Sequence, residues 1–513
     1  MQYGLARAAW PGDEWLGDEW LGDEEAAMTR DTADAYPGLP REARVVNLGL
    51  RVFADAVAAQ GGTVVQVDTR PPAGGDLAAV RALTDLYGPR SEGIDAANAA
   101  VLRRLDQGVP HAVDVRAAGD VVPGFGGRML LHPGPPIGWN DVCDPLRRSM
   151  RAAVVAEGWA PTVADADPLL ASGAVTLAAA NDHATVVPLA TALGPSMPVW
   201  VIDHAGDSGD AHAFAPVSQG PGDTAWLGRE SPAAIERLVF LREVAGPRLG
   251  RILAQTGPID VLAIAAQGVQ MGDDVHMRTQ ASTNLLLRAM LPAIAALDGD
   301  QGSVAFGEYL ATNHLFFLTL AMAAAKALTR DAERVAGSSI VTTMARNGTT
   351  YGVKLAGDDR WFPAACPPVE AALFYADYGP GDGAPDIGDS AVLELIGLGG
   401  AATAGSPAVA AFLGGSMADA ARATDDMRQI CAAESTRFKL PTMDFRGTPV
   451  GVDVRRVVDS GLTPRVNTGI LHASAGLGQV GAGVATAPAE AFRAALGSLA
   501  AAPEPAGSGG HES

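Results

Sequence analysis

Two carboxylates, an imidazole and a guanidinium stand close together in the segment Met271-Gly272-Asp273-Asp274-Val275-His276-Met277-Arg278. An imidazole can transfer a proton or polarise a carbonyl group, and an arginine can bind a carboxylate or phosphate through its forked donors. Asp273 and Asp274 could also ligate a hard metal ion, although their spacing fits no known metal-binding loop. A substrate site, a metal site and a solvated loop all stay open as interpretations of this segment.

Six further segments fix polar side chains beside glycine or proline, or on an apolar helix. One of them, Ala345-Arg346-Asn347-Gly348, ends a predicted strand, where open α/β sheets bind ligands. Each segment also has a structural interpretation, in which the polar group is a loop residue or finds its partner inside the protein. The candidate residues in these six segments are His132, Asn313, His314, Arg346, Asn347, Asp389, Arg446, Asn467 and His472.

The segment Gly476-Leu477-Gly478-Gln479-Val480-Gly481 matches the G-x-G-x-x-G pattern of dinucleotide-binding loops. That function requires a strand directly before the loop and a helix directly after it, whereas the preceding strand is weak and Pro488 soon interrupts the chain after the loop. The sequence therefore does not favour a nicotinamide cofactor. Clustered backbone amides could instead hold a phosphate or a carboxylate, with Gly476, Gly478 and Gly481 as the candidate positions.

The composition is that of a globular, acidic chain of 513 residues, in which 37 Lys and Arg against 58 Asp and Glu give a net charge of −21. Nucleic acids and anionic membranes need a positive footprint, so neither is expected as the main partner. Three widely separated cysteines and the lack of a signal-like start indicate a reducing cytoplasm. The most apolar helical stretch, Leu315 to Ala325, is too short to span a bilayer and predicts a buried helix.

The elements that position these residues are expected to form an α/β fold, with a Rossmann-like parallel-sheet N-terminal part and a larger mixed α/β or α+β C-terminal part. A strand, a helix and a second strand over 44–68 predict a parallel βαβ unit. The predicted organisation is a disordered acidic arm at 1–40, a Rossmann-like domain at 41–125, a second α/β domain at 126–257, an α+β domain at 258–495 and a disordered tail at 496–513.

Two predicted elements of the C-terminal domain carry candidate residues. A strand at Val261 to Ala265 precedes the 271–278 segment, and a long buried helix runs from about Phe306 to Val335 with Asn313 and His314 on it. On this helix Phe306, Leu310, Asn313, Phe317, Leu320 and Ala324 share one face at helical spacing.

Taken together, the motifs resemble the YlbE/YahG-type family, which is encoded beside FdrA-type proteins, from about Val45 to Phe492. The resemblance rests on many segments in one order: Asn47-Leu48-Gly49-Leu50, Pro71 to Asp76, Leu131-His132 with Gly134-Pro135-Pro136, Glu157-Gly158-Trp159-Ala160, Pro195-Ser196-Met197-Pro198, Met344 to Gly348, Asp386 to Ser390, Asp444 to Pro449, and Asn467 to Gly483.

This resemblance implies a subunit of an oxamate carbamoyltransferase, which in purine degradation by way of allantoin splits oxalurate with phosphate into oxamate and carbamoyl phosphate. It implies an FdrA-type partner, a homodimer within a larger complex as one arrangement, and no redox cofactor. We assign no metal ligands, although metal binding by Asp273 and Asp274 stays open. Under this hypothesis Arg346 and Arg446 recognise anions, His132 or His276 polarises the carbonyl, and the Gly476 to Gly483 loop supplies amide donors. We place Asp273 with the histidines as catalytic, and the other candidates in substrate binding.

The chain departs from the family pattern at Asp274, Val275, Met277 and Thr319, where the family would carry Glu, Cys, Asn and Asn. A methionine in place of an asparagine removes an amide donor and acceptor, so the substrate can differ. Two alternatives stay open: a phosphate-independent hydrolase of a ureido or cyclic amide, in which Asp273 or Asp274 activates water, and a non-catalytic subunit that shapes a partner's site.

Overall fold

The computed structural model describes residues 44–67 and 71–503, apart from 208, 298, 300, 370 and 413. The chain divides into two compact units, Met1–Pro71 and Pro72–Ser513. The predicted arm at 1–40 lies outside the described residues, and so does the end of the predicted tail, 504–513. The start of that predicted tail is helical, because the last helix continues to Ala501. The predicted boundaries at 125 and 257 stay predictions.

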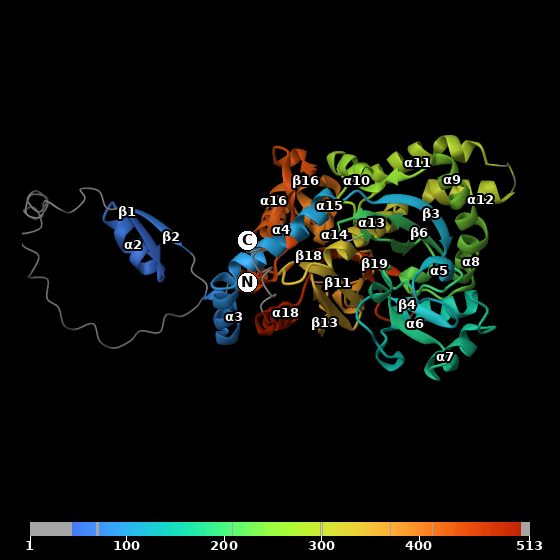
Figure 1. Ribbon diagram of the computed structural model, residues 1–513, viewed down its shortest axis with the longest axis horizontal. Coiled ribbons are helices and arrows are strands. Elements are labelled where there is room, and N and C mark those ends of the chain that lie inside the picture. The colour runs from blue at the N-terminus through green and yellow to red at the C-terminus, as the bar shows by residue number, and fades with distance from the viewer. Residues whose placement is uncertain are drawn as a thin grey trace, which may run out of the picture. The chain divides into compact units, whose positions relative to one another are not determined.

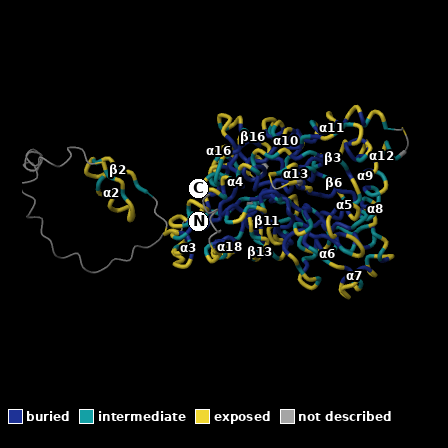
Figure 2. The backbone as a smooth tube through the Cα atoms, viewed as in Figure 1, coloured by how far each residue is buried: buried dark blue, intermediate teal, exposed yellow. Residues whose placement is uncertain are grey.

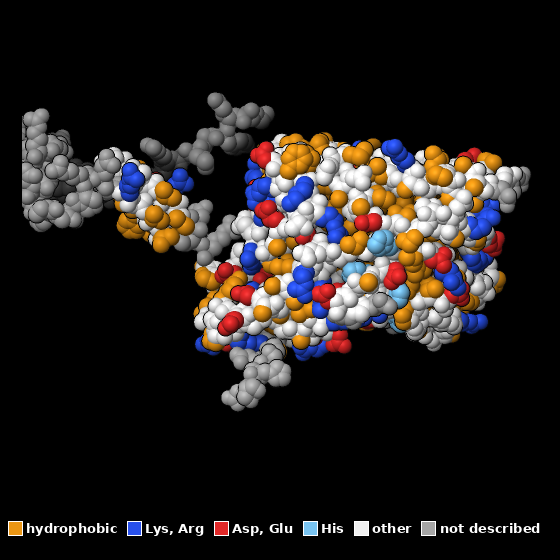
Figure 3. All heavy atoms as spheres, turned by 45° about the horizontal axis from the view of Figure 1, so that its top comes forward, with side chains coloured by type: hydrophobic (Ala, Val, Ile, Leu, Met, Phe, Trp, Pro, Cys, Tyr) orange, Lys and Arg blue, Asp and Glu red, His pale blue; other side chains and the backbone are white. Residues whose placement is uncertain are grey.

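The described part of the first unit is the predicted βαβ unit. Strand β1 (Arg44–Leu48) and strand β2 (Thr63–Val67) pair in parallel, with Arg44 opposite Thr63, and α2 (Arg51–Ala59) connects them. Val46, Leu48 and Val65 are 58–68% exposed. Figure 3 shows the hydrophobic side chains that gather on this unit. The parallel pairing confirms the sequence prediction for 44–68.

The second unit combines several small sheets with helices, so the predicted α/β class is confirmed. Strand β3 (His111–Ala117) pairs antiparallel in the four-stranded sheet β10-β3-β6-β9. A second four-stranded sheet, β13-β12-β11-β15, and the three-stranded sheet β14-β19-β18 are antiparallel as well, and the pair β4-β5 is parallel. The strands of this unit are β3 (His111–Ala117), β4 (Met129–His132), β5 (Thr176–Ala179), β6 (Pro198–Asp203), β7 (Ala205–Gly206), β8 (Gly209–Asp210), β9 (Ala213–Pro216), β10 (Ile259–Asp260), β11 (Val341–Asn347), β12 (Thr350–Leu355), β13 (Asp358–Ala365), β14 (Ala371–Phe374), β15 (Ile387–Gly388), β16 (Cys431–Leu440), β17 (Arg446–Val452), β18 (Arg465–Leu471) and β19 (Gln479–Thr486).

Helices cover these sheets and fill the space between them (Figure 1). None of the helices in the described part of the chain has the length and apolar content needed to cross a membrane. The α-helices of the second unit are α3 (Leu77–Tyr87), α4 (Ser91–Gln107), α5 (Ala118–Val121), α6 (Asp144–Ala156), α7 (Val163–Ala171), α8 (Pro232–Phe240), α9 (Gly246–Thr256), α10 (Val261–Gln270), α11 (Gln280–Ala295), α12 (Gln301–Thr312), α13 (Phe316–Ala332), α14 (Val392–Leu395), α15 (Pro407–Phe412), α16 (Met417–Ile430), α17 (Val454–Ser460) and α18 (Ala489–Ala501).

Helix α13 is the buried helix that the apolar stretch from Leu315 predicted. It packs against β6 and β9 and against α4, α10 and α14, and nearly all of its residues are buried (Figure 2). The prediction of one helix from Phe306 to Val335 is wrong, because the chain leaves the helical path at Asn313 and α12 and α13 are separate. The Asn313 side chain bonds with the Ser218 hydroxyl instead of lying within a continuous helix.

The predicted strand at Val261 to Ala265 is also wrong, because these residues open α10. Asp260 precedes the run, and its carboxylate accepts a hydrogen bond from the Ala263 amide at 2.9 Å, which is a helix N-cap. A short apolar run has the same appearance in a buried helix and in a strand, so the cap decides between them. The 271–278 segment therefore follows a helix and leads into α11.

Candidate functional site

A pocket of about 660 Å³ lies in the second unit, where the start of α13 meets loops from distant parts of the sequence. Four predicted site residues line it: His276, Arg278, His314 and Gly478. The other polar side chains in the lining are those of Arg229, Thr279, Gln280, Ser390, Thr468 and Gln479. Cations, imidazoles and hydroxyls thus surround a space large enough for a small organic substrate.

Asp274 holds the turn that presents His276 and Arg278 to the pocket. Its carboxylate accepts hydrogen bonds from the backbone amides of His276, Met277 and Arg278, at 3.1, 3.3 and 2.8 Å. Val275, inside this turn, has a φ of 58° and is fully buried. A β-branched residue in the left-handed region is strained, and such strain is typical of functional sites. The surrounding structure therefore fixes the His276 backbone firmly.

Glu394 orients the His276 ring from behind the pocket. The Nδ1 atom of His276 lies 2.7 Å from Glu394 Oε1, and both side chains are buried. An ionised carboxylate only accepts hydrogen bonds, so we assign the proton to Nδ1, which leaves Nε2 as the ring nitrogen for a ligand. Glu394 itself comes from α14 and also accepts from the Gly400 amide at 3.0 Å. A histidine backed by a carboxylate is the usual arrangement for proton transfer.

Asp273, predicted as catalytic, caps α11 in the structure. Its carboxylate accepts from the Ala281 and Ser282 amides and from the Ser282 hydroxyl, at 3.2, 2.8 and 2.9 Å. Burial raises the pKa of Asp273, although these donors oppose the shift. It does not line the pocket, but its Oδ1 lies 3.5 Å from Arg278 Nε. Its contacts fix the start of α11 and the position of the arginine.

Arg278 and Arg229 are the cations of the pocket. Their side chains are 41% and 31% exposed, so both can reach a ligand. Arg229 is held by Asp223, with 2.5 Å between Nε and Oδ1, and by the Leu477 carbonyl at 2.9 Å. Two arginines in one pocket suit a ligand, or a pair of ligands, with two anionic groups.

A buried ion pair supports the wall formed by Thr468 and Ser390. The Thr468 hydroxyl donates to Asp386 at 2.9 Å, and Asp386 pairs with Arg346 at 2.7 Å. Burial disfavours the charged form of Arg346, but Asp386 outweighs it and raises the pKa of the guanidinium. Arg346 is fully buried, also donates to the Gly388 carbonyl, and does not line the pocket. The structure thus places this predicted anion-binding residue behind the wall.

The glycine-rich loop enters the pocket as the connection between β18 and β19. Gly478 lines the pocket with a φ of 87°, and Ala475, before the loop, has a φ of 64°. A strand follows the loop and no helix does, so the geometry of a dinucleotide fingerprint is absent from this part of the chain. Gly476 does not line the pocket and has Arg148 beside it, while Gly481 lies within β19 opposite Phe374 and Ile470.

Three other predicted residues, His132, Asn347 and Asp389, form a buried cluster outside the pocket lining. His132 Nδ1 contacts the Pro133 carbonyl at 2.8 Å, and burial lowers the pKa of this imidazole to about 4. Asn347 donates to the Pro135 carbonyl at 2.9 Å. Asp389 accepts from the Gly134 and Val187 amides, and burial raises its pKa to about 7.

Four more predicted residues also lie outside the pocket lining. Asn467 is buried behind it and donates to Asp274 at 2.7 Å, which ties β18 to the His276 turn. Asn313 is paired with Ser218. Arg446 is 53% exposed and pairs with Glu434. His472 accepts from the Ser474 amide and contacts the Tyr378 ring.

The departures from the family pattern have separate structural consequences. Met277 lines the pocket between His276 and Arg278. Thr319 lies in the core, where its hydroxyl accepts a hydrogen bond from the Trp200 indole at 3.2 Å. Within the described residues, no group of three or more His, Cys, Asp and Glu side chains could hold a metal ion.

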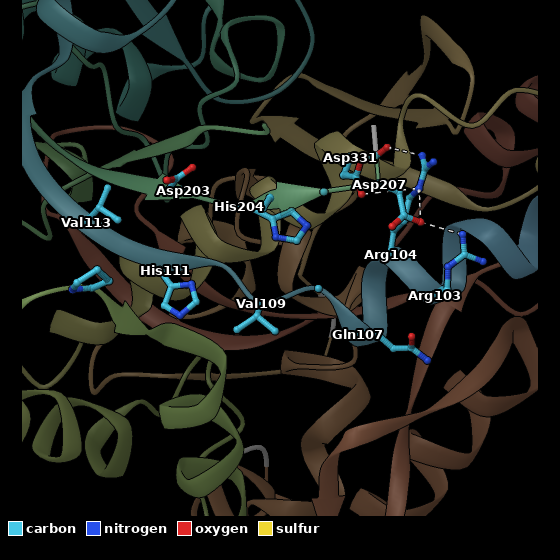
Figure 4. Close-up of a pocket in the computed structure, with 14 residues that line it drawn as sticks. Arg103, Arg104, Gln107, Val109, His111, Val113, Asp203, His204, Asp207 and Asp331 are labelled. Atoms are coloured by element: carbon cyan, nitrogen blue, oxygen red, sulfur yellow. Dashed lines mark hydrogen bonds and ion pairs between the residues drawn. The ribbon is translucent and has the colours of Figure 1, made fainter. Parts of the chain in front are cut away.

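A second pocket, of about 690 Å³, contains none of the predicted site residues (Figure 4). Arg103 and Arg104 lie along one side, and both point toward Asp207, at 2.8 and 3.7 Å. His204 is buried there, and burial lowers its pKa. Arginines face carboxylates in both pockets, so the predicted residues His276, Arg278, His314 and Gly478, which line only the first, single that pocket out as the candidate site.

Arg229 and Glu394 belong to the candidate site, but the sequence analysis did not single them out. Arg229 follows Gly228 in a Gly- and Pro-rich stretch, which is the one local signal for it. Glu394 is 118 positions from His276 and has no glycine or proline next to it. Thr468 and Ser390 lie inside segments that the sequence singles out, directly beside the candidate residues Asn467 and Asp389.

Comparison with known proteins gives consistent matches. A profile of the family described as "Oxamate carbamoyltransferase subunit AllG" matches residues 175–390, a range that includes the pocket lining from Pro188 to Ser390. The oxamate carbamoyltransferase subunit AllG of Escherichia coli (strain K12) is 37% identical over 411 residues, covering 79% of this chain and 97% of the relative. The uncharacterized protein YahG of the same organism is 34% identical over 456 residues, covering 88% and 96%. The crystal structure of a conserved protein of unknown function from Enterococcus faecalis V583 matches with a TM-score of 0.77 and 33% identity, covering 80% of this chain and 98% of that chain.

Proposed function

Because this chain belongs to the family of the oxamate carbamoyltransferase subunit AllG, we propose that it is a carbamoyltransferase subunit that acts with phosphate on oxalurate-like ureido acids. In this reaction a phosphate oxygen bonds to the ureido carbonyl carbon, and the bond from that carbon to the amide nitrogen breaks. The products are carbamoyl phosphate and an amide such as oxamate.

The contact between His276 and Glu394, next to Arg278 in the same pocket, is the observation that carries this proposal. The reaction needs one group that moves a proton and cations that hold two anions, phosphate and the substrate carboxylate. His276 Nε2 is the group that moves the proton, and Arg278 and Arg229 are the cations that hold the phosphate and the carboxylate. Ser390 and the Gly478 amide, both in the lining, are the donors that we assign to the carbonyl oxygen.

The proton balance agrees with this arrangement. Hydrogen phosphate loses its proton to His276 Nε2 as its oxygen attacks the carbonyl carbon. The resulting imidazolium is stabilised by Glu394 and then gives the proton to the nitrogen of the departing amide. No net proton is consumed, and no redox step is involved.

We propose further that the chain works in a heteromeric complex. The relative AllG is named as a subunit, and we assign an FdrA-type protein as the partner. A non-catalytic subunit is the second candidate, because the pocket is solvent-accessible and a partner can complete it. The hydrolase alternative receives less support, because the carboxylates of Asp273 and Asp274 are occupied by backbone donors.

The test is carbamoyl phosphate formation from oxalurate and phosphate, with the purified chain alone and with its co-encoded FdrA-type protein. We compare wild type with Arg278→Ala and with Arg288→Ala, an exposed arginine of α11 outside the pocket lining. Loss of one charge-assisted contact should raise KM for phosphate or oxalurate about 10- to 100-fold in Arg278→Ala and leave Arg288→Ala unchanged.

Three outcomes would contradict the proposal. If Arg278→Ala and wild type form product equally well, the pocket around His276 takes no part in the reaction. No product in either preparation, with both proteins folded, would favour another substrate or the non-catalytic role. Turnover without phosphate would instead favour the hydrolase.

A further inference from the structure

The pocket around His276 has an apolar wall as well as polar groups. We call the apolar wall the six side chains of Leu189, Met277, Leu315, Leu318, Tyr375 and Leu477. Tyr375 and Leu477 are 45% and 46% exposed, although both are large and belong to a pocket. Exposed apolar side chains that line a concave site mark a surface that a ligand or partner covers.

Leu189, which belongs to the apolar wall, has a strained backbone conformation. Leu189 has a φ of 47°, a conformation that a branched side chain rarely adopts. Its neighbours hold the segment: the Ala190 amide donates to the Trp226 carbonyl at 3.1 Å, and Thr191 donates to the Pro188 carbonyl at 2.6 Å. Such strain persists where the surrounding structure fixes a functional conformation.

The volume of the pocket exceeds what the smallest substrates of the proposed reaction would fill. Oxalurate and phosphate together contain about fourteen non-hydrogen atoms. Even at the roughly 30 Å³ that a water molecule occupies in the liquid, they would fill only about 420 Å³, whereas the pocket measures about 660 Å³. Both molecules are also strongly polar, so neither would cover the apolar wall.

We infer that the ureido substrate of this chain carries an aliphatic or aromatic substituent, which packs against the apolar wall. This inference rests on the proposed function, since it concerns the same pocket. The carboxylate and the phosphate are held by the arginines, and the ureido carbonyl faces His276. Met277 joins the two regions, because it comes directly after His276 and contributes an apolar side chain to the lining. The chemical class is therefore N-carbamoyl acids with an apolar side chain.

The test is a series of binding titrations by calorimetry in phosphate buffer, with the full chain alone and in complex with its FdrA-type partner. The probes are oxalurate, N-carbamoylglycine, N-carbamoylleucine and N-carbamoylphenylalanine. Burial of the isobutyl or benzyl group should make the last two bind at least about 10-fold more tightly than N-carbamoylglycine. Leu477→Ser should reduce this ratio at least threefold, whereas Leu291→Ser, an exposed leucine of α11 outside the lining, should not change it.

The outcomes separate this inference from the proposed function. If N-carbamoylglycine and oxalurate bind as tightly as the substituted acids, and Arg278→Ala weakens them, the inference is overturned and the proposed function stands. If no ureido acid binds to the chain or to the complex, both are overturned. If the preference seen with the chain alone disappears in the complex, the partner covers the apolar wall, and the inference is also overturned.

Discussion

The hydrogen bond from His276 to Glu394 sets which ring nitrogen carries the proton. A glutamine at position 394 can turn its NH₂ group toward Nδ1, which would shift the proton to Nε2 and remove the base. We therefore expect Glu394→Gln to lower kcat of the complex by roughly 100-fold or more. The pH profile of kcat/KM should lose or shift its lower limb, which loss of structural support alone would not cause.

The matched control for this prediction is Glu434→Gln. Glu434 is a half-exposed glutamate of β16 that pairs with Arg428 and Arg446, far from any pocket residue in sequence. Its variant should keep wild-type kinetics. A Glu394→Gln protein with normal kcat and an unchanged pH profile would show that His276 does not transfer the proton.

Asp389 makes the stability of the protein depend on pH. Burial raises its pKa from 3.8 to about 7 in the folded chain, so folding favours the protonated form. Its contribution to stability is complete below pH 4 and is lost as the pH rises through 7. Asp389→Asn has no such loss. Between pH 5 and pH 8 its free energy of unfolding should therefore gain about 2–3 kcal/mol relative to wild type.

Urea unfolding at the two pH values measures this difference, and Asp359→Asn, at an exposed position of β13, controls for the loss of a carboxylate. If the free energies of unfolding of Asp389→Asn and wild type differ by the same amount at pH 5 and pH 8, the carboxyl group titrates alike in the folded and unfolded chains. The comparison uses the change with pH, because the amide also replaces one acceptor of the Gly134 and Val187 amides.

At the scale of elements, the sequence correctly predicts the helices and strands whose hydrophobic pattern and turn residues lie within or directly beside the element. The βαβ unit, the strand β11 that ends at Asn347 and the buried helix α13 agree with hydrophobic pattern and turn residues. The strand predicted at Val261 to Ala265 is wrong because a short apolar run fits both states, and only the Asp260 cap distinguishes them. The helix from Phe306 is predicted without a break because Asn313 has helical spacing, and its bond to Ser218 comes from a segment 95 residues away.

The candidate site shows the same limit. The 271–278 segment stands out in the sequence because its reactive residues are adjacent. Arg346 and Asp389 are charged residues like those of the 271–278 segment, but both are buried and hydrogen-bonded to other parts of the protein. They therefore support the fold and do not face the pocket. No sequence pattern predicts such burial. Folding brings Arg229 into the pocket lining and Glu394 against the His276 ring behind it, and one sequence does not reveal such contacts between distant segments.

The break between α12 and α13 positions His314 and Leu315 in the pocket. Asn313 closes this break by exchanging hydrogen bonds with the buried Ser218 hydroxyl at 3.2 and 3.3 Å. Asn313→Ala removes both of these hydrogen bonds and leaves the Ser218 hydroxyl only the Gly220 amide as a partner, at 3.3 Å. The variant should lower the free energy of unfolding by about 1–2 kcal/mol and weaken ligand binding. Denaturant unfolding and calorimetry measure both effects. Asn140→Ala, at an exposed position outside the pocket lining, is the matched control; equal stability of the two variants would count against a role for Asn313 in the break.

At the scale of the whole molecule, the two compact units have different relations to the pocket. Every residue of the lining, from Pro188 to Ala482, belongs to Pro72–Ser513. In the described part of the other unit, β1 and β2 pair only with each other. A sheet of two strands is marginal by itself, so this unit should add little to the stability of the second one.

Deletion of residues 1–71 tests this division. We expect the shortened chain to fold, to unfold thermally within about 2 °C of the full chain, and to bind ureido acids and phosphate with affinities within twofold, because every described residue that lines the pocket is kept. Calorimetry and circular dichroism measure these quantities. A shortened chain that folds normally but has lost its affinity would show that the first unit contributes to the site. Binding that is retained, together with loss of turnover in the complex, would assign the first unit to partner association and leave the chemistry with the pocket around His276.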